Sequence, residues 1–588
     1  MEKWFIKNRQ GDYSKIAEKY GISDILVKLI ANRSIHSEEA LTQYLNPSLS
    51  QLHDPVLMKD MKKAVAILKD KIEKKQSIRI VGDYDVDGVM STYILYTGLC
   101  KAGASVDYDI PERIKDGYGI NISIIEKANE DGINTILTCD NGIAAIDQIA
   151  HAKDLGMTVI VTDHHDIGFI ENEGKRSYQL PKADAIVNPK QEDCNYPYKG
   201  ICGAVVAYKL IEALYRSLHI NEKEIEVLLE FVAIATVCDV MDLMDENRAI
   251  VKYGLEHMPH TTNLGLSCLI DETGIGGKAL SVYHLGFIIG PCINASGRLD
   301  SAKLSLRLFL SKEEKTARAL AKELKELNDE RKEMTQKGLE EAIAIIDSGT
   351  YEKDKVLVIY LPDCHESLAG IIAGRLKERY YRPVIVLTDG HDCIKGSARS
   401  IEAYNMFEEL NKCKDILSKF GGHPMAAGLS LPKDRLLELR ERLNENVSLS
   451  EEDLQEKVSI DLVLSFDRIN YSLIQEISFL EPYGKGNTRP LFVEKNVRVI
   501  KATIIGKNRN VLRMTVASPD QPSLRFNAML FHKIDVFEEL VINRYGQSEL
   551  DAIYTGNGTS ISMDMTFYPD INEYNGIQTI QLIIQNFR

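Results

Sequence analysis

Residues 77–88 read SIRIVGDYDVDG, an apolar run that leads directly into three aspartates and a glycine. Two later segments follow the same plan, TILTCDNG at 135–142 and TVIVTDHHD at 158–166. Helical patterns such as Met90–Cys100 separate the apolar runs. This alternation is typical of a parallel sheet covered by helices on both faces. The expected strands of the sheet are Ser77–Val81, Thr135–Thr138 and Thr158–Thr162.

Acidic residues follow each expected strand, and two histidines follow the third. The carboxyl ends of parallel strands meet at one edge of a sheet, and open α/β sheets bind ligands there. Crowded carboxylates repel one another, and a metal ion is the usual compensation. Oxygen and imidazole ligands suit manganese or magnesium, and two such ions about 3.5–4 Å apart serve phosphoryl chemistry. The side chains concerned are Asp83, Asp85, Asp87, Asp140, Asp163, His164 and His165.

Turn preference offers an alternative explanation, because Asp and Asn-Gly are common after strands. It accounts for a single aspartate, but much less well for acidic groups after three consecutive strands. Asp239, in IATVCDVMDL at 234–243, is a weaker candidate. A buried aspartate needs a partner, which a metal would supply. The alternatives for Asp239 are a helix cap or an ion pair with Arg248.

Composition limits the class of protein. The 588 residues, 44% hydrophobic and 27% charged, predict a globular protein of several domains and exclude a disordered chain or a fibrous rod. The net charge of −15 gives no overall basic surface for nucleic acid. However, the stretch 495–519 contains basic residues and no acid before Asp520, so a local DNA or RNA surface stays open.

The expected location is the cytoplasm. The 10 cysteines include no CxxC pair, which favours buried thiols in a reducing compartment over disulfides or a zinc site. No apolar run approaches the roughly 20 residues of a membrane span. The N-terminal MEKWFIKNRQ has no signal-peptide core.

Nine ordered motifs carry a resemblance to one family. VGDYDVDG, TCDNGI, VTDHH and ATVCDVMDL are similar to the four motifs of the DHH phosphoesterases. PERIKDGYGI, PCINASGRLD, KGSARS, FGGHPMAAG and FLEPYGKGNTRPLF narrow the resemblance to the single-stranded-DNA-specific exonucleases of that family, over essentially the whole chain.

The resemblance implies a multidomain α/β protein. Its parts would be a parallel-sheet DHH domain, a long connector helix at Ser311–Asp347, a second α/β DHH-associated domain and a C-terminal OB-like β-barrel. The expected limits are 1–55 for an N-terminal helical segment, 56–270 for the DHH domain, 271–350 for a substrate-contacting segment with the connector, 351–450 for the DHH-associated domain and 456–588 for the OB domain. From the residues alone, the part after about 457 is expected to be all-β.

The resemblance also implies roles in a site with two divalent cations. The implied metal ligands are Asp85, Asp87, Asp140, His164 and Asp239, with Asp140 as the bridging carboxylate. Asp83 and Asp163 would support the ligands, and His165 would bind or polarise the scissile phosphate. The chain departs from the pattern at Val81, where related pyrophosphatases have a metal-binding His, and at Asp242, where the family often has Pro. We expect water to replace the missing imidazole, and little consequence from Asp242.

Further residues match positions that contact the substrate. By resemblance, the residues that bind the 5′-phosphate and the neighbouring backbone are Arg113, Arg298, Ser397, Arg399, Gly421, Gly422 and His423. Arg suits this role because its planar fork makes bidentate bonds to phosphate. Considered alone, each Arg is better explained by a surface salt bridge and GGH by a turn. In the OB domain, Phe526, Phe531, Phe567, Tyr568 and Tyr574 are candidates for base stacking, of which only one or two are expected to stack.

The expected function is a metal-dependent 5′→3′ exonuclease that degrades single-stranded DNA to 5′-mononucleotides in recombination and repair. Two alternatives are a phosphodiesterase for short oligoribonucleotides or cyclic dinucleotides and a non-enzymatic DNA-binding scaffold. The added β domain disfavours the first, and the intact acidic motifs disfavour the second. Single-strand binding protein and a helicase are plausible partners by family role, no membrane partner is expected, and a monomer is expected.

Overall fold

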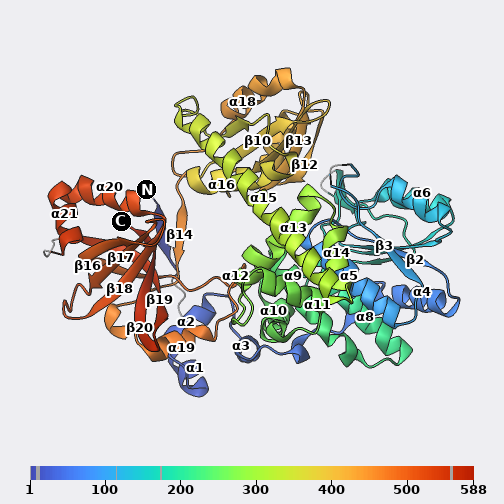
Figure 1. Ribbon diagram of the computed structural model, residues 1–588, viewed down its shortest axis with the longest axis horizontal. Helices are drawn as coiled ribbons and strands as arrows, with labels where there is room; N and C mark the ends of the chain where they lie inside the picture. Colours follow the sequence, from blue (N-terminus) through green and yellow to red (C-terminus); the bar gives the residue numbers. More distant parts are fainter. Residues whose placement is uncertain (1, 8–12, 114, 173–174, 557–560) are drawn as a thin grey trace. The chain divides into compact units, whose positions relative to one another are not determined.

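The computed structural model describes residues 2–7, 13–113, 115–172, 175–556 and 561–588, and Figure 1 labels their helices and strands. The chain divides into two compact units: Ser48–Glu456, and Met1–Pro47 together with Lys457–Arg588. Of the expected N-terminal segment 1–55, residues 1 and 8–12 lie outside the described part. None of the described helices is long and apolar enough to cross a membrane.

A five-stranded parallel sheet opens the first unit, as predicted. The strands lie in the order β3–β2–β4–β5–β8, and every neighbouring pair is parallel. Their bounds are β2 Ile78–Val81, β3 Val106–Asp109, β4 Thr135–Cys139, β5 Thr158–Thr162 and β8 Ala185–Val187. In the sheet, β3 lies on one side of β2 and β4 lies on the other side. The strand order therefore reverses between β2 and β4, and such switch points are where open sheets bind ligands.

Helices cover both faces of this sheet because side chains alternate along each strand. Ile80 and Leu137 pack into a core shared with α5 (Val86–Lys101) and α8 (Gly203–Leu218). Val81 and Ile136 pack on the opposite side with α6 (Ile122–Glu130) and α7 (Ile146–Asp154). The sequence analysis missed the edge strands β3 and β8, because β3 contains two aspartates and β8 is only three residues long.

The DYDVDG segment turns directly from β2 into α5. The helix begins at Val86 rather than at the predicted Met90, because Asp85 caps it. Oδ1 of Asp85 accepts a hydrogen bond from the Gly88 N–H at 3.0 Å. A Cβ at position 88 would lie 2.5 Å from the Asp83 carbonyl oxygen, so this turn requires glycine.

The connector is one helix, α15, Glu314–Asp347. Near its start, Leu320 and Leu324 pack into the core that includes α5 and α8. Near its end, Ala342 and Ile346 belong to the core of the second α/β part. It therefore joins the two parts by packing against both.

Other α-helices of this unit are α4 Met61–Glu73, α9 Leu229–Cys238, α10 Asp245–His257, α11 Leu264–Glu272, α13 Gly290–Leu299, α14 Lys303–Leu310, α16 Ala369–Tyr380, α17 Met406–Lys412 and α18 Leu436–Glu445.

The second α/β part contains a mixed sheet in the order β12–β13–β11–β10–β9. Its strands are β9 Leu357–Tyr360, β10 Val384–Asp389, β11 Ile394–Arg399, β12 Lys419–His423 and β13 Ala426–Leu431. Ser397 lies opposite Gly428, and Gly428 lies opposite Gly421. Residues of the KGSARS and FGGHPMAAG motifs are thus side by side on three neighbouring strands.

In the other unit, β16 pairs with β17, β17 with β18, β18 with β20 and β20 with β19, and β19 also pairs with β16. The bounds are β16 Phe492–Ile505, β17 Val511–Ala517, β18 Arg525–Phe531, β19 Ser562–Tyr574 and β20 Ile577–Phe587. The short strand β15 (Leu462–Val463) pairs with β16. The N-terminal strand β1 (Lys3–Ile6) pairs with β14 (Lys457–Ile460). Three helices come after β1 in the sequence: α1 Tyr13–Tyr20, α2 Asp24–Ala31 and α3 Glu38–Leu45.

The prediction that the C-terminal part is all-β is wrong. It contains α19 (Tyr471–Ser478), α20 (Ile534–Tyr545) and α21 (Gln547–Thr555). In α20, Phe537 and Val541 lie four residues apart and are both buried, which is the helical period that the analysis overlooked. Phe567 is also unavailable for base stacking, because it is fully buried against Phe466 and Phe492.

Candidate active site

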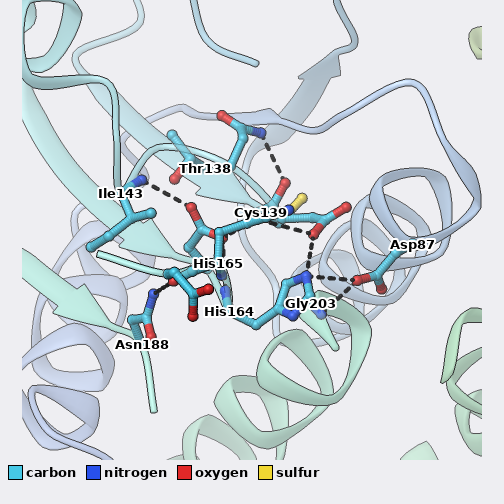
Figure 2. A network of polar contacts seen from close by, with 12 residues as sticks. Asp87, Thr138, Cys139, Ile143, His164, His165, Asn188 and Gly203 are labelled. Carbon is cyan, nitrogen blue, oxygen red and sulfur yellow. Dashed lines mark hydrogen bonds and ion pairs between the residues drawn. The ribbon is translucent and has the colours of Figure 1, made fainter. Parts of the chain in front are cut away.

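The predicted acidic residues and histidines meet at the carboxyl ends of β2, β4 and β5. Figure 2 shows His164 and His165 near Asp87. Three groups of donor atoms each lie within 4.8 Å of one another: Asp83–Asp85–Asp140, Asp87–His164–Asp239 and Asp140–His164–His165. Asp140 and His164 each belong to two groups. The seven residues therefore form one continuous set, which we call the acidic cluster. Asp239 follows α9 and enters the cluster through a carboxylate oxygen 3.6 Å from His164 Nε2.

Two backbone donors at the start of α8 hold Asp87, as Figure 2 shows for Gly203. Oδ2 of Asp87 accepts from the Gly203 N–H at 2.6 Å, and Oδ1 accepts from the Ala204 N–H at 2.8 Å. The N-terminus of a helix stabilises a negative charge. A Cβ at position 203 would lie 2.8 Å from the Cβ of Asp140, so glycine allows this helix to approach both aspartates.

Asp163 is buried and fixes both histidines. It accepts hydrogen bonds from the Ile143 N–H at 2.9 Å, the His164 N–H at 2.7 Å, the His165 N–H at 3.0 Å and His165 Nδ1 at 2.8 Å. Burial by itself would raise the pKa of Asp163, but the bonds to His165 keep it below the usual value. Burial would lower the pKa of His165, but Asp163 raises it to about 9. The two side chains therefore form an ionised pair.

The remaining carboxylates are crowded. Burial and the neighbouring acidic groups raise the pKa of Asp83, Asp85 and Asp140, and raise the pKa of Asp239 to about 8. Burial lowers the pKa of His164, which keeps its imidazole neutral. Within the described residues, Oδ1 of Asp83, Oδ1 of Asp140 and both ring nitrogens of His164 are buried and make no hydrogen bond. These donor atoms fit divalent cations such as Mn²⁺ or Mg²⁺.

Three arginines form a second set, which we call the arginine cluster: Arg113, Arg298 and Arg399. Burial lowers the pKa of Arg298 to about 10, and repulsion from Arg113 and Arg399 contributes. Burial and Arg113 also lower the pKa of Arg399. Arg298 is oriented by a hydrogen bond from Nη1 to the Ser367 carbonyl oxygen at 2.6 Å. Partly desolvated guanidinium groups that repel one another favour the binding of an anion such as phosphate.

A cavity of about 390 Å³ lies where the two α/β parts of this unit meet, a size typical of small-molecule sites. Its lining includes Tyr84, Arg113, Gly117, Tyr118, Ser367, Ser397, Gly421 and Gly428. Tyr84 stands between Asp83 and Asp85 in the sequence, and the Arg113 guanidinium lies 4.9 Å from the centre of its ring. Arg113 lines the cavity from the arginine cluster, and the lining residue Tyr118 hydrogen-bonds the carbonyl oxygen of Asp140 in the acidic cluster.

Three family models match successive parts of the chain: the DHH family N-terminal domain at residues 77–236, the DHHA1 domain at 353–449 and the RecJ OB domain at 460–586. The chain is 35% identical over 589 residues to the single-stranded-DNA-specific exonuclease RecJ of Bacillus subtilis (strain 168), covering 99% of this chain and 70% of that protein. The RecJ of Escherichia coli (strain K12) is 32% identical over 585 residues, covering 96% of this chain and 95% of that protein. The chain belongs to the RecJ family.

Solved RecJ structures have the same fold. The crystal structure of RecJ in complex with Mn²⁺ from Thermus thermophilus matches 100% of this chain and 79% of that chain, with a TM-score of 0.81 and 24% identity. The crystal structure of exonuclease RecJ bound to manganese matches 69% of this chain and 100% of that chain, with a TM-score of 0.59 and 30% identity.

Not all predicted substrate residues of this RecJ-family chain line the cavity. Arg113, Ser397 and Gly421 do, whereas Arg298, Arg399, Gly422 and His423 are not among the lining residues. Gly422 has φ 149°, and a Cβ there would lie 2.4 Å from the Ala426 carbonyl oxygen. Its glycine therefore serves the β12–β13 hairpin. Next to the DHH motif, Nζ of Lys190 lies 2.9 Å from Oδ1 of Asp166 and lowers the pKa of that carboxyl.

Val81 marks the departure from the related pyrophosphatases. Its side chain is fully buried and packs with Ile136 in the apolar core next to α6 and α7. No ligand for a metal comes from this position.

The sequence analysis missed two residues that hold the acidic cluster. The Asn141 amide donates to the carbonyl oxygens of Val81 at 3.1 Å and Cys139 at 2.9 Å, so it ties the ends of β2 and β4 together. The Tyr118 hydroxyl donates to the Asp140 carbonyl oxygen at 3.0 Å. Asn141 was explained by turn preference, and Tyr118 lies in the PERIKDGYGI motif, where only Arg113 was singled out.

Mn²⁺ is expected to raise the melting temperature of the protein, because a cation removes the repulsion between buried carboxylates. At a free concentration of 100 times its Kd, a ligand adds about 2.7 kcal/mol to the free energy of unfolding. Thermal melting with Mn²⁺ and with EDTA measures the shift. Asp140→Asn is the matched control and should show a much smaller shift. An equal shift in both proteins would place the cation elsewhere.

Proposed function

We propose that this chain is a metal-dependent exonuclease that removes 5′-mononucleotides from the 5′ end of single-stranded DNA. The observation that carries the proposal is the cavity lined by Arg113 of the arginine cluster and by Tyr118, which hydrogen-bonds Asp140 of the acidic cluster. The arginine cluster suits a terminal phosphate, and the acidic cluster suits the metal ions that act on the next phosphodiester bond. The relatives named RecJ supply the substrate, single-stranded DNA.

Two divalent cations, Mn²⁺ or Mg²⁺, would be held by Asp85, Asp87, Asp140, His164 and Asp239. When bound, they supply an activated water and offset the charge that develops on the phosphoryl oxygens. We assign the bridging position to Asp140 because it belongs to two donor groups. A carboxylate oxygen of Asp83 lies within 4.8 Å of ligand atoms of Asp85 and Asp140. We assign Asp83 the role of supporting these metal ligands.

We assign His165 to the scissile phosphate. Its side chain is 43% exposed, in contrast to His164 at 7%, so it can reach the substrate. Asp163 keeps the imidazole protonated and holds Nδ1. A cationic imidazole can donate a hydrogen bond to a phosphoryl oxygen and stabilise negative charge there.

The arginine cluster and Ser397 are proposed to bind the 5′-phosphate, with the backbone at Gly421 close to it. Arg399→Ala is expected to raise KM for a 5′-phosphorylated strand by about 10- to 100-fold, since hydrogen bonds to charged groups contribute about 1.5–3 kcal/mol. KM for the same strand with a 5′-hydroxyl should change much less. Steady-state kinetics with both strands gives the comparison. Arg379→Ala, on the exposed side of α16, is the control. Equal losses on both strands would contradict a 5′-phosphate site.

We propose that the OB-like domain binds the single strand. Its charged candidates are exposed on β16, β17 and the turn between them: Lys495, Arg498, Lys501, Lys507, Arg509 and Arg513. Tyr574 is 73% exposed and is the best-placed aromatic for stacking. A basic surface with exposed aromatics tracks single strands without reading their sequence.

The test of the function uses a long single strand with a 3′ label, with and without a 5′-phosphate, and a matching blunt duplex. Mn²⁺ is present, and EDTA and Asp140→Ala are the controls. The expected result is release of mononucleotides from the 5′ end of the single strand only. Turnover of oligonucleotides of about two to five nucleotides, with an intact long strand, would overturn the proposal in favour of a short-oligonucleotide phosphodiesterase.

We propose the domain limits 1–55, 56–270, 271–350, 351–450 and 456–588. They are supported by the family matches at 77–236, 353–449 and 460–586, which fall inside three of them. We further propose that the protein acts as a monomer in the cytoplasm, in DNA recombination and repair, with single-strand binding protein and a helicase as partners.

A further inference from the structure

The hydroxyl group of Tyr118 lies between two members of the acidic cluster. It donates to the Asp140 carbonyl oxygen at 3.0 Å, and it lies 3.3 Å from Nε2 and 3.4 Å from Nδ1 of His165. Nδ1 of His165 is already bonded to Asp163. The hydroxyl group therefore contacts an imidazole that Asp163 already holds in place. This one hydroxyl group therefore contacts Asp140, which belongs to two donor groups, and His165, which is assigned to the scissile phosphate.

The loop that carries Tyr118 is fixed to the turn that contains Asp140. The Ile120 N–H donates to Oδ1 of Asn141 at 3.1 Å. Gly119 has φ 67°, and a Cβ there would lie 3.1 Å from the Cβ of Asn141. Glycine thus permits both the left-handed backbone and the close approach. Two hydrogen bonds, from the Ile120 N–H and from the Tyr118 hydroxyl, therefore join the loop to the turn.

Asp140 needs this support because its backbone is in the left-handed region, with φ 60°. Non-glycine residues adopt this conformation only where surrounding contacts hold it. The bond from Tyr118 fixes the peptide plane that follows Asp140. It therefore limits the directions in which the Asp140 carboxylate can point.

The loop also reaches the arginine cluster. The Glu112 N–H donates to Oδ2 of Asp116 at 2.8 Å, and the Asp116 N–H donates to the Glu112 carbonyl oxygen at 2.8 Å. Arg113 lies within the turn that these bonds close, and Tyr118 follows Asp116 by two residues. Arg113 and Tyr118 both line the cavity. A phosphate bound at Arg113 therefore contacts the same short loop that holds Asp140.

We propose that Tyr118 is a positioning residue that orients Asp140 and His165 and couples them to the phosphate bound at the arginine cluster. The proposal rests on the proposed exonuclease function. Removal of the hydroxyl group alone should weaken metal binding and slow the chemical step, while the ring continues to line the cavity. The kinetic advantage of a 5′-phosphate should shrink, because the loop no longer transmits its presence.

The test compares the full-length protein with Tyr118→Phe. The Kd for Mn²⁺ in the absence of DNA, measured by calorimetry, is expected to rise by about tenfold, as for other residues that hold ligands. With saturating Mn²⁺, kcat should still fall by about tenfold, while KM for the 5′-phosphorylated strand changes by less than about twofold. The ratio of kcat on 5′-phosphorylated and 5′-hydroxyl strands should decrease.

Tyr178→Phe, at an exposed tyrosine of β7 (Lys175–Tyr178), is the control for loss of a hydroxyl group and should match the unmodified protein. If the unmodified protein degrades single-stranded DNA and Tyr118→Phe matches it in Mn²⁺ affinity, kcat and the 5′-phosphate ratio, the inference is overturned and the function stands. If the unmodified protein does not degrade single-stranded DNA, the proposed function and the coupling fall together. The Mn²⁺ affinity then still decides the positioning role.

Discussion

The substitution Asp140→Asn is expected to lower kcat on single-stranded DNA by about 10³- to 10⁴-fold. Metal ions supply several kcal/mol of transition-state stabilisation, and each 1.36 kcal/mol is a factor of about ten in rate. Asp140 is 2% exposed and belongs to two donor groups, so its loss affects both proposed cation positions. Asparagine keeps the size and shape of the side chain, and the expected effect therefore comes from the lost charge.

Without bound metal, Asp140→Asn should not lower the thermal stability of the protein. Burial and neighbouring carboxylates raise the pKa of Asp140, so its charged form destabilises the empty site. Asp140→Asn should therefore melt no lower than the unmodified protein in EDTA. Rapid-quench kinetics and thermal melting test the two statements. Asp147→Asn, on the exposed side of α7, is the control and should leave both quantities unchanged. A variant that loses activity and also melts far lower would indicate a structural role for Asp140.

The acidic cluster was predictable because each of its main groups follows directly after a strand. The strand and its acidic residues are adjacent in sequence, so a correct assignment of β2, β4 and β5 places the carboxylates at one edge. The arginine cluster is different. Arg298 comes from α13 and Arg399 from β11, and only tertiary packing brings their charges near that of Arg113. The resemblance, and no local pattern, drew attention to these arginines.

The missed features share a physical cause, since each depends on contacts rather than on periodicity. Tyr118 acts through its hydroxyl group, and a lone tyrosine in a polar loop carries no pattern. The helices α19 and α20 lie among short strands and Asn/Gly turns, and those strand and turn patterns led to the all-β prediction. Phe567 is buried by Phe466, which comes from a segment about 100 residues earlier. Its burial could not be deduced from the strand in which it lies.

Asp163→Asn is expected to destabilise the DHH domain by about 3 kcal/mol and to lower kcat by about 10- to 100-fold. Asp163 is 1% exposed and accepts four hydrogen bonds, three of them from backbone N–H groups. Asparagine retains one acceptor oxygen and presents an NH₂ group where an acceptor is needed. A buried donor left without a partner costs about 1–3 kcal/mol, and the bonds to a charged acceptor are stronger than average. For a domain of about 200 residues, about 3 kcal/mol corresponds to a decrease of about 6–12 °C in melting temperature.

The kinetic part of this prediction follows from the geometry of His165. Without the negative charge of the carboxylate, the His165 imidazole loses the interaction that keeps it protonated. Loss of such outer contacts at metal sites costs about 10- to 100-fold in activity. Melting in EDTA, together with rate measurements well below the melting temperature, separates the two effects. Asp154→Asn, exposed at the end of α7, controls for the same chemical change and should stay within about 0.5 kcal/mol. A protein that melts normally but is inactive would assign Asp163 to the chemistry alone, whereas normal kcat after destabilisation would remove it from the active site.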